Sequence, residues 1–178
     1  MERTPARKND PPAPVSDTAG GLHQYLSFQL KGELFAIGIL HIKEIIEYGR
    51  LTPVPMMPEF ICGVINLRGA VVPVIDLSCR FGRGKSEIGR RTCIVILELE
   101  WLEEVQVIGV IVDAVNEVLE IDAREIAPPP SFGANIQTHF IEGMGRLEHG
   151  FIIILQIDRI LSAADVALME RMAETVAD

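Results

Sequence analysis

Residues Phe60–Phe81 read FICGVINLRGAVVPVIDLSCRF and predict a buried β-hairpin. Two apolar runs, Ile61–Leu67 and Ala70–Leu77, are rich in valine and isoleucine, whose branched side chains pack well on a pleated surface. Only Arg68-Gly69 lies between these runs, and a connection that short joins antiparallel neighbours. Gly69 can adopt the positive φ that such a turn needs. The hairpin therefore carries one cation at its tip, either a solvated turn residue or a rigidly held binding contact.

The composition describes a chain that can bury a sizeable core and that carries a large negative charge. It has 178 residues, 48% of them hydrophobic, and a net charge of −9. A field of that sign repels phosphate backbones, so nucleic acid is not an expected partner. No apolar run approaches the roughly 18–20 residues that cross a bilayer, so direct membrane insertion is not expected either. Three cysteines without CxxC spacing, each beside an apolar run, favour a reduced, cytoplasmic protein.

The two ends of the chain differ in character from the middle. Residues 1–22 are rich in proline and glycine and are expected to be disordered. Residues 23–160 are expected to form a single folded domain, followed by a helix within residues 161–178. Ser162 and Asp165 have the spacing of a helix-capping pair, and Val166 and Met169 share one apolar face of this helix.

Between these ends the pattern predicts four hairpins, two short helices and two irregular segments. The hairpins are expected at 25–39, 60–77, 92–112 and 140–157, the helical turns at 40–48 and 113–120, and further strands near 51–55 and 121–126. The connector 79–91 holds five of the sixteen basic residues and is either a solvated loop or a weak contact for an acidic partner. The acidic turn around Trp101 either folds back on its own barrel or contacts a partner.

The two halves of the chain repeat one plan. Ala36–Glu47 aligns with Gly109–Glu120 at an offset of 73 residues, Phe60-Ile61-x-Gly63 with the stretch from Phe140 at 80, and Ile75-Asp76 with Ile157-Asp158 at 82. Each half therefore predicts one small barrel, about 23–91 and 92–160, because closing a sheet removes its exposed edges. The expected fold class is mainly β, with two intertwined five-stranded SH3-like barrels, short helices between strands, a C-terminal helix, and a groove between the barrels.

The order of these features, and above all the stretch GVINLRGAVVPVIDL, resembles the CheW family of chemotaxis coupling proteins. The similarity covers about Gln24 to Met172, and the second-half stretch GVIVDAVNEVLEI supports it independently. The resemblance implies a non-enzymatic adaptor that links the cytoplasmic tip of membrane chemoreceptors to the regulatory domain of the histidine kinase CheA. It implies no cofactor and no metal, and a cytoplasmic protein recruited to receptor arrays through its partners.

The resemblance also implies site residues. The functional arginine of the NLRG motif falls on Arg68, a helix glutamate on Glu44, and a glycine linked to kinase coupling on Gly63. From the residues themselves, Gly63 is equally well a strand kink, and Glu44 a solvated helix position that faces outward while Ile42, Ile45 and Ile46 face the core.

Further residues have supporting or undecided roles. Asn66 is expected to support the turn by local hydrogen bonding, with Gly69 beside it. Asp76 and Asp158 are plausible helix N-caps. A set of apolar residues is a candidate either for the groove or for the core between the barrels: Ile37, Ile39, Val110 and Val112.

Several alternatives stay open. The adaptor could belong to a parallel pathway that controls pili or biofilm formation, since Ser78 and the long Trp101 turn depart from the usual pattern. A two-barrel module that binds a ligand or peptide without kinase coupling is the rival class. The best enzyme hypothesis, a hydrolase pairing Cys62 or Cys79 with His41 or His139, has little support, because buried thiols have raised pKa values and the histidines lack metal-ligand spacing.

Overall fold

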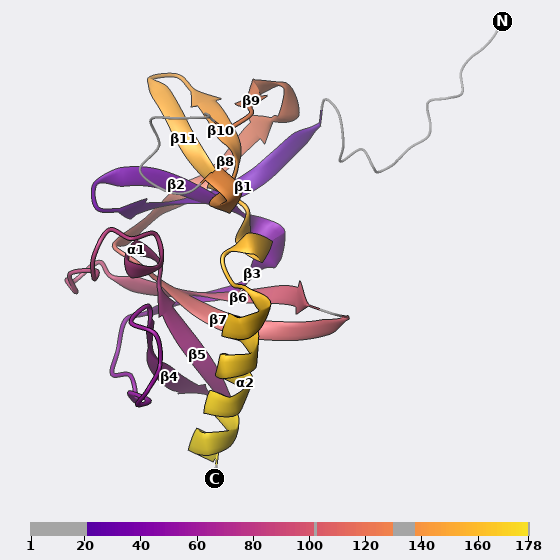
Figure 1. Ribbon diagram of the computed structural model, residues 1–178. Coiled ribbons are helices and arrows are strands. Elements are labelled where there is room, and N and C mark those ends of the chain that lie inside the picture. The colour runs from indigo at the N-terminus through magenta and orange to yellow at the C-terminus, as the bar shows by residue number, and fades with distance from the viewer. Residues whose placement is uncertain (1–20, 102, 130–137, 178) are drawn as a thin grey trace, which may run out of the picture.

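The chain folds into two β-sheets that lie one above the other, with a long helix running beside the lower one (Figure 1). The structure is a computed structural model that describes residues 21–101, 103–129 and 138–177. Most of the predicted disordered tail, residues 1–22, lies outside these ranges, and the first strand already begins at Leu22. Within the described residues, no helix has the length and apolar composition needed to cross a membrane.

Each sheet curls into a small barrel, as the sequence predicted. The upper barrel follows the order β8 (Ala114–Asp122), β1 (Leu22–Leu30), β2 (Glu33–Gly38), β11 (Gly150–Leu155), β10 (Ile141–Leu147) and β9 (Ile126–Ala127). The lower barrel follows the order β3 (Ile42–Glu47), β6 (Cys93–Trp101), β7 (Glu104–Val112), β5 (Ala70–Asp76) and β4 (Ile61–Leu67). The short β9 gives the upper barrel a sixth strand, so the expected five-stranded count holds for the lower barrel only.

Short helical segments connect the strands, and one longer helix follows them. They are η3 (Ile39–His41), α1 (Leu77–Arg80), η4 (Ala123–Glu125), η5 (Thr138–Phe140), η6 (Ile157–Arg159) and the C-terminal α2 (Ala163–Ala177). Helix α2 confirms the predicted C-terminal helix. Its start shows the predicted capping pair, because the Ser162 N–H donates to Asp165 at 2.9 Å and the Asp165 N–H donates to the Ser162 hydroxyl at 3.2 Å.

The expected division into barrels of about 23–91 and 92–160 is wrong, because each barrel draws strands from both halves of the chain. The chain passes from the upper to the lower barrel through η3 and returns after β7. Parallel pairing joins the halves: Ala36 of β2 lies opposite Ile154 of β11, and Gly109 of β7 lies opposite Val74 of β5. Each barrel therefore combines the first hairpin of one repeat with the later strands of the other.

The repeat itself is visible in the backbone hydrogen bonds. The Asp76 N–H donates to the Phe60 carbonyl at 2.8 Å, and the Gln156 N–H donates to the Phe140 carbonyl at 2.7 Å. The offset is thus 80 at both ends of the hairpin, and the predicted offset of 82, which matched Asp76 to Asp158, is wrong. Asp76 caps α1 by accepting from the Cys79 N–H, as predicted, whereas η6 is capped at Gln156 without a side-chain hydrogen bond.

The two predicted short helices at 40–48 and 113–120 are strands β3 and β8. Apolar residues at Ile42, Ile45 and Ile46 fit a helix and a strand about equally well, and pairing with distant partners decides between them. In β3, Ile46 lies opposite Ile94 of β6. Alternation then leaves Ile45 42% exposed, while Glu44 shares the partly buried face with Ile42 and Ile46.

The largest hydrophobic cluster lies between the two barrels and takes residues from both. Three of the groove candidates, Ile37, Val110 and Val112, are fully buried in it, and Ile39 packs against it. Their place is therefore the core between the barrels, and the groove interpretation is wrong for them. Separate, smaller clusters fill the interior of each barrel. Val166 and Met169 of α2, the predicted apolar face, are buried in the cluster between the barrels.

The basic stretch 79–91, which includes the end of α1, is only partly the solvated loop expected from the sequence. The guanidinium of Arg80 lies 4.8 Å from the ring centre of Phe60 and 5.0 Å from that of Phe140, and its Nε donates to the Ile160 carbonyl at 2.7 Å. Arg80 thus joins equivalent aromatic residues of the two repeats to the segment that leads into α2. Arg83 forms an ion pair with Glu33, and its side chain is 14% exposed.

Candidate functional site

The hairpin tip of β4 and β5 is a two-residue turn with both central residues in the left-handed region. Leu67 pairs with Ala70, and φ is 53° at Arg68 and 91° at Gly69. Two positive φ values match the twist of a tight hairpin, and a non-glycine residue accepts this conformation only at some cost. The Asn66 side chain stabilises the turn by accepting a hydrogen bond from the Gly69 N–H at 3.0 Å. This confirms the supporting role predicted for Asn66.

The turn holds Arg68 against Glu44 of β3 in a bidentate ion pair. The two guanidinium nitrogens donate to the two carboxylate oxygens at 2.7 and 2.8 Å. The side chain of Arg68 is 69% exposed and that of Glu44 is 24% exposed, so the pair presents a solvent-facing cation over a partly covered carboxylate. Hydrogen bonding from Arg68 holds the pKa of Glu44 below its usual value, and the same bonds raise the pKa of Arg68. The structure therefore brings together the two residues that the sequence singled out separately.

The equivalent tip of the upper barrel lacks this pair. Leu147 pairs with Gly150 across a turn of Glu148 and His149, so at the offset of 80 Glu148 takes the place of Arg68. At the offset of 73 the counterpart of Glu44 is Glu117, so a carboxylate corresponds to each member of the pair. The upper hairpin also closes with a two-residue loop, but neither Glu148 nor His149 has a positive φ. The ion pair is thus not required to build this barrel hairpin.

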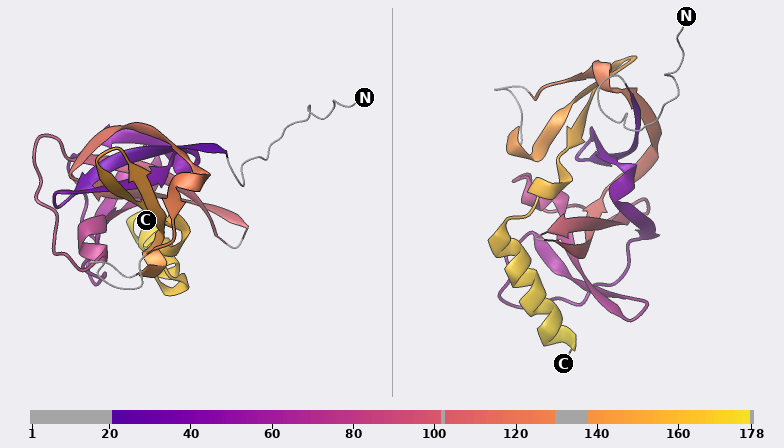
Figure 2. Two further views of the ribbon diagram at one scale, coloured as in Figure 1. Left: turned by 90° about the horizontal axis from the view of Figure 1, so that it is seen from above. Right: turned by 90° about the vertical axis from the view of Figure 1, so that its right-hand side faces the viewer.

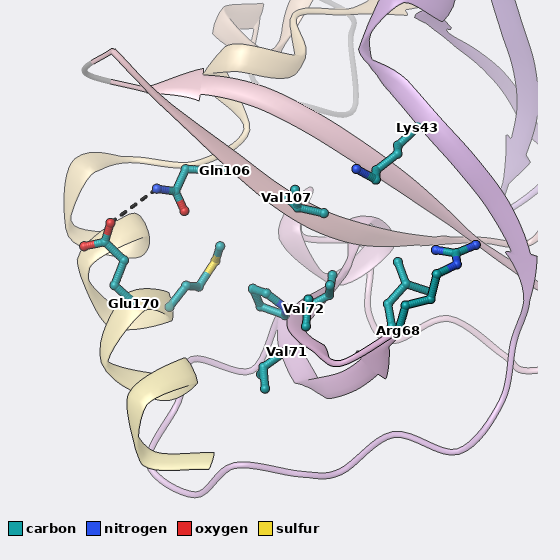
Figure 3. Close-up of a pocket in the computed structure, with 11 residues that line it drawn as sticks. Lys43, Arg68, Val71, Val72, Gln106, Val107 and Glu170 are labelled. Carbon is teal, nitrogen blue, oxygen red and sulfur yellow. Dashed lines mark hydrogen bonds between the residues drawn. The ribbon is translucent and has the colours of Figure 1, made fainter. Parts of the chain in front are cut away.

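A pocket of about 450 Å³ opens beside the tip, between the hairpin, β7 and α2 (Figure 3). Val71, Val72, Val107 and Met169 give it apolar walls. Figure 3 shows Lys43 and Arg68 on one side of the pocket and Gln106 and Glu170 on the opposite side. The amide of Gln106 donates to the Glu170 carboxylate at 3.3 Å. An apolar cleft with charged groups at its edge suits an amphipathic partner surface.

The sequence did not identify Lys43, Gln106 or Glu170 as neighbours of Arg68. Lys43 directly precedes Glu44, but reading this stretch as a helix obscured its position relative to the hairpin tip. In the structure the Lys43 ammonium lies 3.0 Å from the Glu98 carboxylate. Gln106 and Glu170 come from elements more than 35 residues from Arg68 in the chain, so only the assembled fold places them there.

Gly63 has a packing role that the structure explains. A Cβ atom at Gly63, where φ is 153°, would lie 2.4 Å from the Thr52 carbonyl oxygen. Thr52 forms an isolated antiparallel bridge with Val64 of β4. Gly143 has the same tight environment in the upper barrel, where a Cβ would lie 2.6 Å from Ile126. The strand-kink interpretation of Gly63 therefore has a direct structural basis in both repeats.

The chemistry of the cysteines does not suit nucleophilic catalysis. Burial raises the pKa of Cys62 to about 11 and also raises the pKa values of Cys79 and Cys93. A thiol with so high a pKa contains little thiolate, the reactive form, at neutral pH. Among the described residues, no group of three or more histidine, cysteine or carboxylate side chains is placed to hold a metal ion.

The fold and the tip define a class: a two-barrel protein with a surface ion pair at one hairpin tip and an apolar pocket beside it. Residues 24–165 match the CheW-like domain. The chain therefore belongs to the CheW family.

Individual relatives agree with this assignment. The chemotaxis protein CheW of Klebsiella aerogenes is 34% identical over 165 residues, covering 92% of this chain and 97% of that protein. The chemotaxis protein CheW of Rhizobium meliloti is 30% identical over 148 residues, covering 83% and 92%. The crystal structure of the scaffolding protein TtCheW from Thermoanaerobacter tengcongensis superposes with a TM-score of 0.73 at 34% identity, covering 91% of this chain and 96% of that one.

Proposed function

We propose that this chain is a non-enzymatic adaptor that couples chemoreceptors to the histidine kinase CheA in bacterial chemotaxis. Its membership of the CheW family supports this, as does its similarity to a solved protein described as a scaffold. In this proposal the chain acts in the cytoplasm and reaches receptor arrays through its partners. The regulatory domain of the kinase and the cytoplasmic tip of the receptor are those partners.

One observation carries the assignment of the site: the Arg68–Glu44 pair occurs at one of two equivalent hairpin tips. A feature that hairpin closure required would be expected in both repeats, since both hairpins close with a two-residue loop. Arg68 is then the residue that contacts the partner, and Glu44 orients its guanidinium through two hydrogen bonds. Asn66 and Gly69 stabilise the turn, and Gly63 acts indirectly by allowing the Thr52 backbone to pack closely against β4.

The pocket beside the tip is the second part of the proposed contact surface. An arginine with an apolar hollow next to it resembles the centre of many interfaces, where a few anchoring residues carry most of the binding free energy. The same pocket is also the observation that would favour a peptide-binding module without kinase coupling. The two functions differ in whether a kinase domain binds.

A capture experiment with the isolated regulatory domain of a CheA-type kinase separates these functions. The adaptor function predicts specific, saturable retention of the wild-type chain. Arg124→Ala is the matched control for Arg68→Ala, because Arg124 forms a similarly exposed bidentate ion pair with Asp122 on the other barrel. If the folded wild-type chain is not retained by the domain, while it still binds a receptor-derived peptide, the peptide-binding module is the correct class.

A further inference from the structure

A β-bulge in β3 places two consecutive charged residues beside the hairpin tip. The register with β6 shifts between Ile42 and Glu44, so Lys43 is an extra residue of β3 that has no Cα partner in β6. Consecutive side chains of a regular strand point to opposite faces of the sheet. Here Glu44 is bonded to Arg68, and Lys43 lines the pocket that Arg68 also lines. The bulge therefore brings a second cation to the site.

The upper barrel has the same bulge without the cation. Where β8 pairs with β1, the two residues Asn116 and Glu117 correspond to the single residue Ser27. At the offset of 73, Asn116 is the counterpart of Lys43. The bulge is thus a feature of the fold in both barrels, whereas the lysine occurs in one of them. A lysine is therefore not required to form the bulge.

Lys43 is held in place by a weak and replaceable contact. Its ammonium donates to the Glu98 carboxylate at 3.0 Å, and the two side chains are 44% and 46% exposed. An ion pair this exposed contributes little to stability, because water competes for both charges. An ammonium group has three N–H donors, and the contact with Glu98 uses one of them. Lys43 can therefore bind a carboxylate of a partner, with or without releasing Glu98, at little cost.

The pocket is built by the lower barrel together with α2. Its lining residues come from β3, the β4–β5 hairpin, β7 and α2. Figures 1 and 2 show α2, in yellow, running along the lower barrel and away from the upper one. The two cations and the apolar walls are therefore positioned by a single sheet and the helix that packs beside it.

Polar groups of different character occupy the two sides of this pocket (Figure 3). Lys43 and Arg68 lie on one side, and Gln106 and Glu170 lie on the other. Each cation is paired with one carboxylate of the chain itself, so an acidic partner gains from direct contacts rather than from a strong local field. A segment that suits this arrangement places an apolar side chain in the pocket and acidic side chains toward the two cations.

We propose that Lys43 is a second specificity-determining residue of the contact surface, which binds a carboxylate of the partner next to the position of Arg68. The occupant is an amphipathic segment of the receptor's cytoplasmic tip, with an apolar side chain in the pocket and two neighbouring carboxylates, one at Arg68 and one at Lys43. This inference rests on the proposed function, because it uses the contact surface assigned there. It adds a requirement for the charge of Lys43 to that for Arg68.

Titration of the chain with a receptor cytoplasmic fragment tests this role. Lys43→Gln is expected to weaken binding about three- to ten-fold, and Lys43→Arg, which keeps the charge, by less than about twofold. Arg124→Gln removes an exposed cation from the upper barrel and is expected to bind as the wild type does. Salt screens a contact between Lys43 and a carboxylate, so the affinity of Lys43→Gln should fall less steeply with ionic strength than that of the wild type.

A second background distinguishes a direct contact from the masking of Glu98. Removing Lys43 leaves Glu98 without this cation, and the carboxylate then repels an acidic partner more strongly. Lys43→Gln is therefore also measured in the Glu98→Gln background. If Lys43 binds the partner directly, the three- to ten-fold loss persists there. If the lysine only masks Glu98, the loss disappears and the inference is overturned.

The same titrations separate the failure of this inference from the failure of the proposed function. Thermal unfolding is expected to be nearly unchanged in each variant, because the substituted side chains are exposed. If Arg68→Ala weakens binding and Lys43→Gln changes it by less than about twofold, this inference alone is overturned. A folded wild-type chain that does not bind the fragment overturns both.

Discussion

Replacing Arg80 with alanine is expected to destabilise the whole fold, although Arg80 is only the last residue of the short helix α1. Its guanidinium lies over the rings of Phe60 and Phe140 at 4.8 and 5.0 Å and donates to the Ile160 carbonyl at 2.7 Å. It also lies 3.5 Å from the carboxylate of Asp165, which caps α2. One side chain thus connects both repeats and the C-terminal helix, and the Arg80→Ala variant loses all of these contacts together.

The size of the effect follows from the kinds of contact. Each cation–π contact contributes about 0.5–2 kcal/mol, depending on how far it is desolvated. The hydrogen bond from a charged donor contributes about 1.5–3 kcal/mol. Because these contacts share one side chain, which remains 22% exposed, their contributions do not simply add. We expect Arg80→Ala to lower the free energy of unfolding by about 2–4 kcal/mol, and the melting temperature by about 4–16 °C for a domain of this size.

Urea unfolding followed by circular dichroism measures this loss, with two variants for comparison. Arg80→Lys keeps the charge but loses the planar group that stacks on both rings, so an intermediate loss is expected. Arg124→Ala removes an exposed pair and is expected to change the free energy of unfolding by at most about 1 kcal/mol. The reasoning is refuted if Arg80→Ala is no more destabilising than Arg124→Ala.

Three further predictions concern stability, protonation and thiol reactivity. Gly63→Ala is expected to lower the free energy of unfolding by about 2 kcal/mol or more, because the new Cβ meets a backbone carbonyl. In Gly69→Ala the new Cβ meets no atom within 4 Å, so the free energy of unfolding should fall by only about 1 kcal/mol, because of the backbone conformation. Equal losses for the two variants in thermal unfolding would contradict this. The pKa of Glu44, followed by NMR, is expected to lie below its usual value and to rise in Arg68→Ala. The contribution of this pair to stability is then present near neutral pH and is lost as the pH falls through the folded-state pKa of Glu44. A titration of Glu44 that is unchanged in Arg68→Ala would show that the bidentate pair does not persist in solution. Cys62, with a pKa of about 11, should react with a thiol reagent at pH 8 through roughly one thiolate in a thousand, and reaction as fast as that of a free thiol would contradict its burial.

The sequence predicts the hairpins well where local chemistry determines them. The Arg68-Gly69 turn allows only a tight connection, so the strands on either side are aligned by the turn itself. The repeat adds a second, independent copy of the same information, and the structure shows the same hydrogen bond at both hairpin ends. These features depend on residues close together in the chain.

Prediction from the sequence fails where contacts between residues far apart in the chain determine the structure. The apolar positions of β3 are compatible with a helix, and only pairing with β6, about 50 residues later, makes this stretch a strand. The interleaving of the two barrels depends on the parallel pairing of β2 with β11, which no local pattern reveals. Without that pairing, the sequence pattern divides the chain near residue 91, whereas both barrels draw strands from both sides of that point.

The candidate site shows the same contrast. Arg68 was predicted at an exposed tip, and the structure finds it there. Its partner Glu44 was predicted on a helix. Predicting the ion pair would require the knowledge that β3 passes beside the hairpin. Arg80 was expected in a solvated loop, since nothing in its neighbourhood indicates that Phe140, sixty residues later, would cover it.

The most direct test of the central claim compares binding and folding in the same variants. Affinity for a receptor cytoplasmic fragment is measured by titration for the wild type, Arg68→Ala and the matched control Arg124→Ala, alongside thermal unfolding of each. If Arg68 is an interface anchor, Arg68→Ala is expected to weaken binding about ten- to a hundred-fold with nearly unchanged unfolding, while the control binds normally. A change of less than about twofold in Arg68→Ala, with folding intact, would contradict the assignment of function to this hairpin tip.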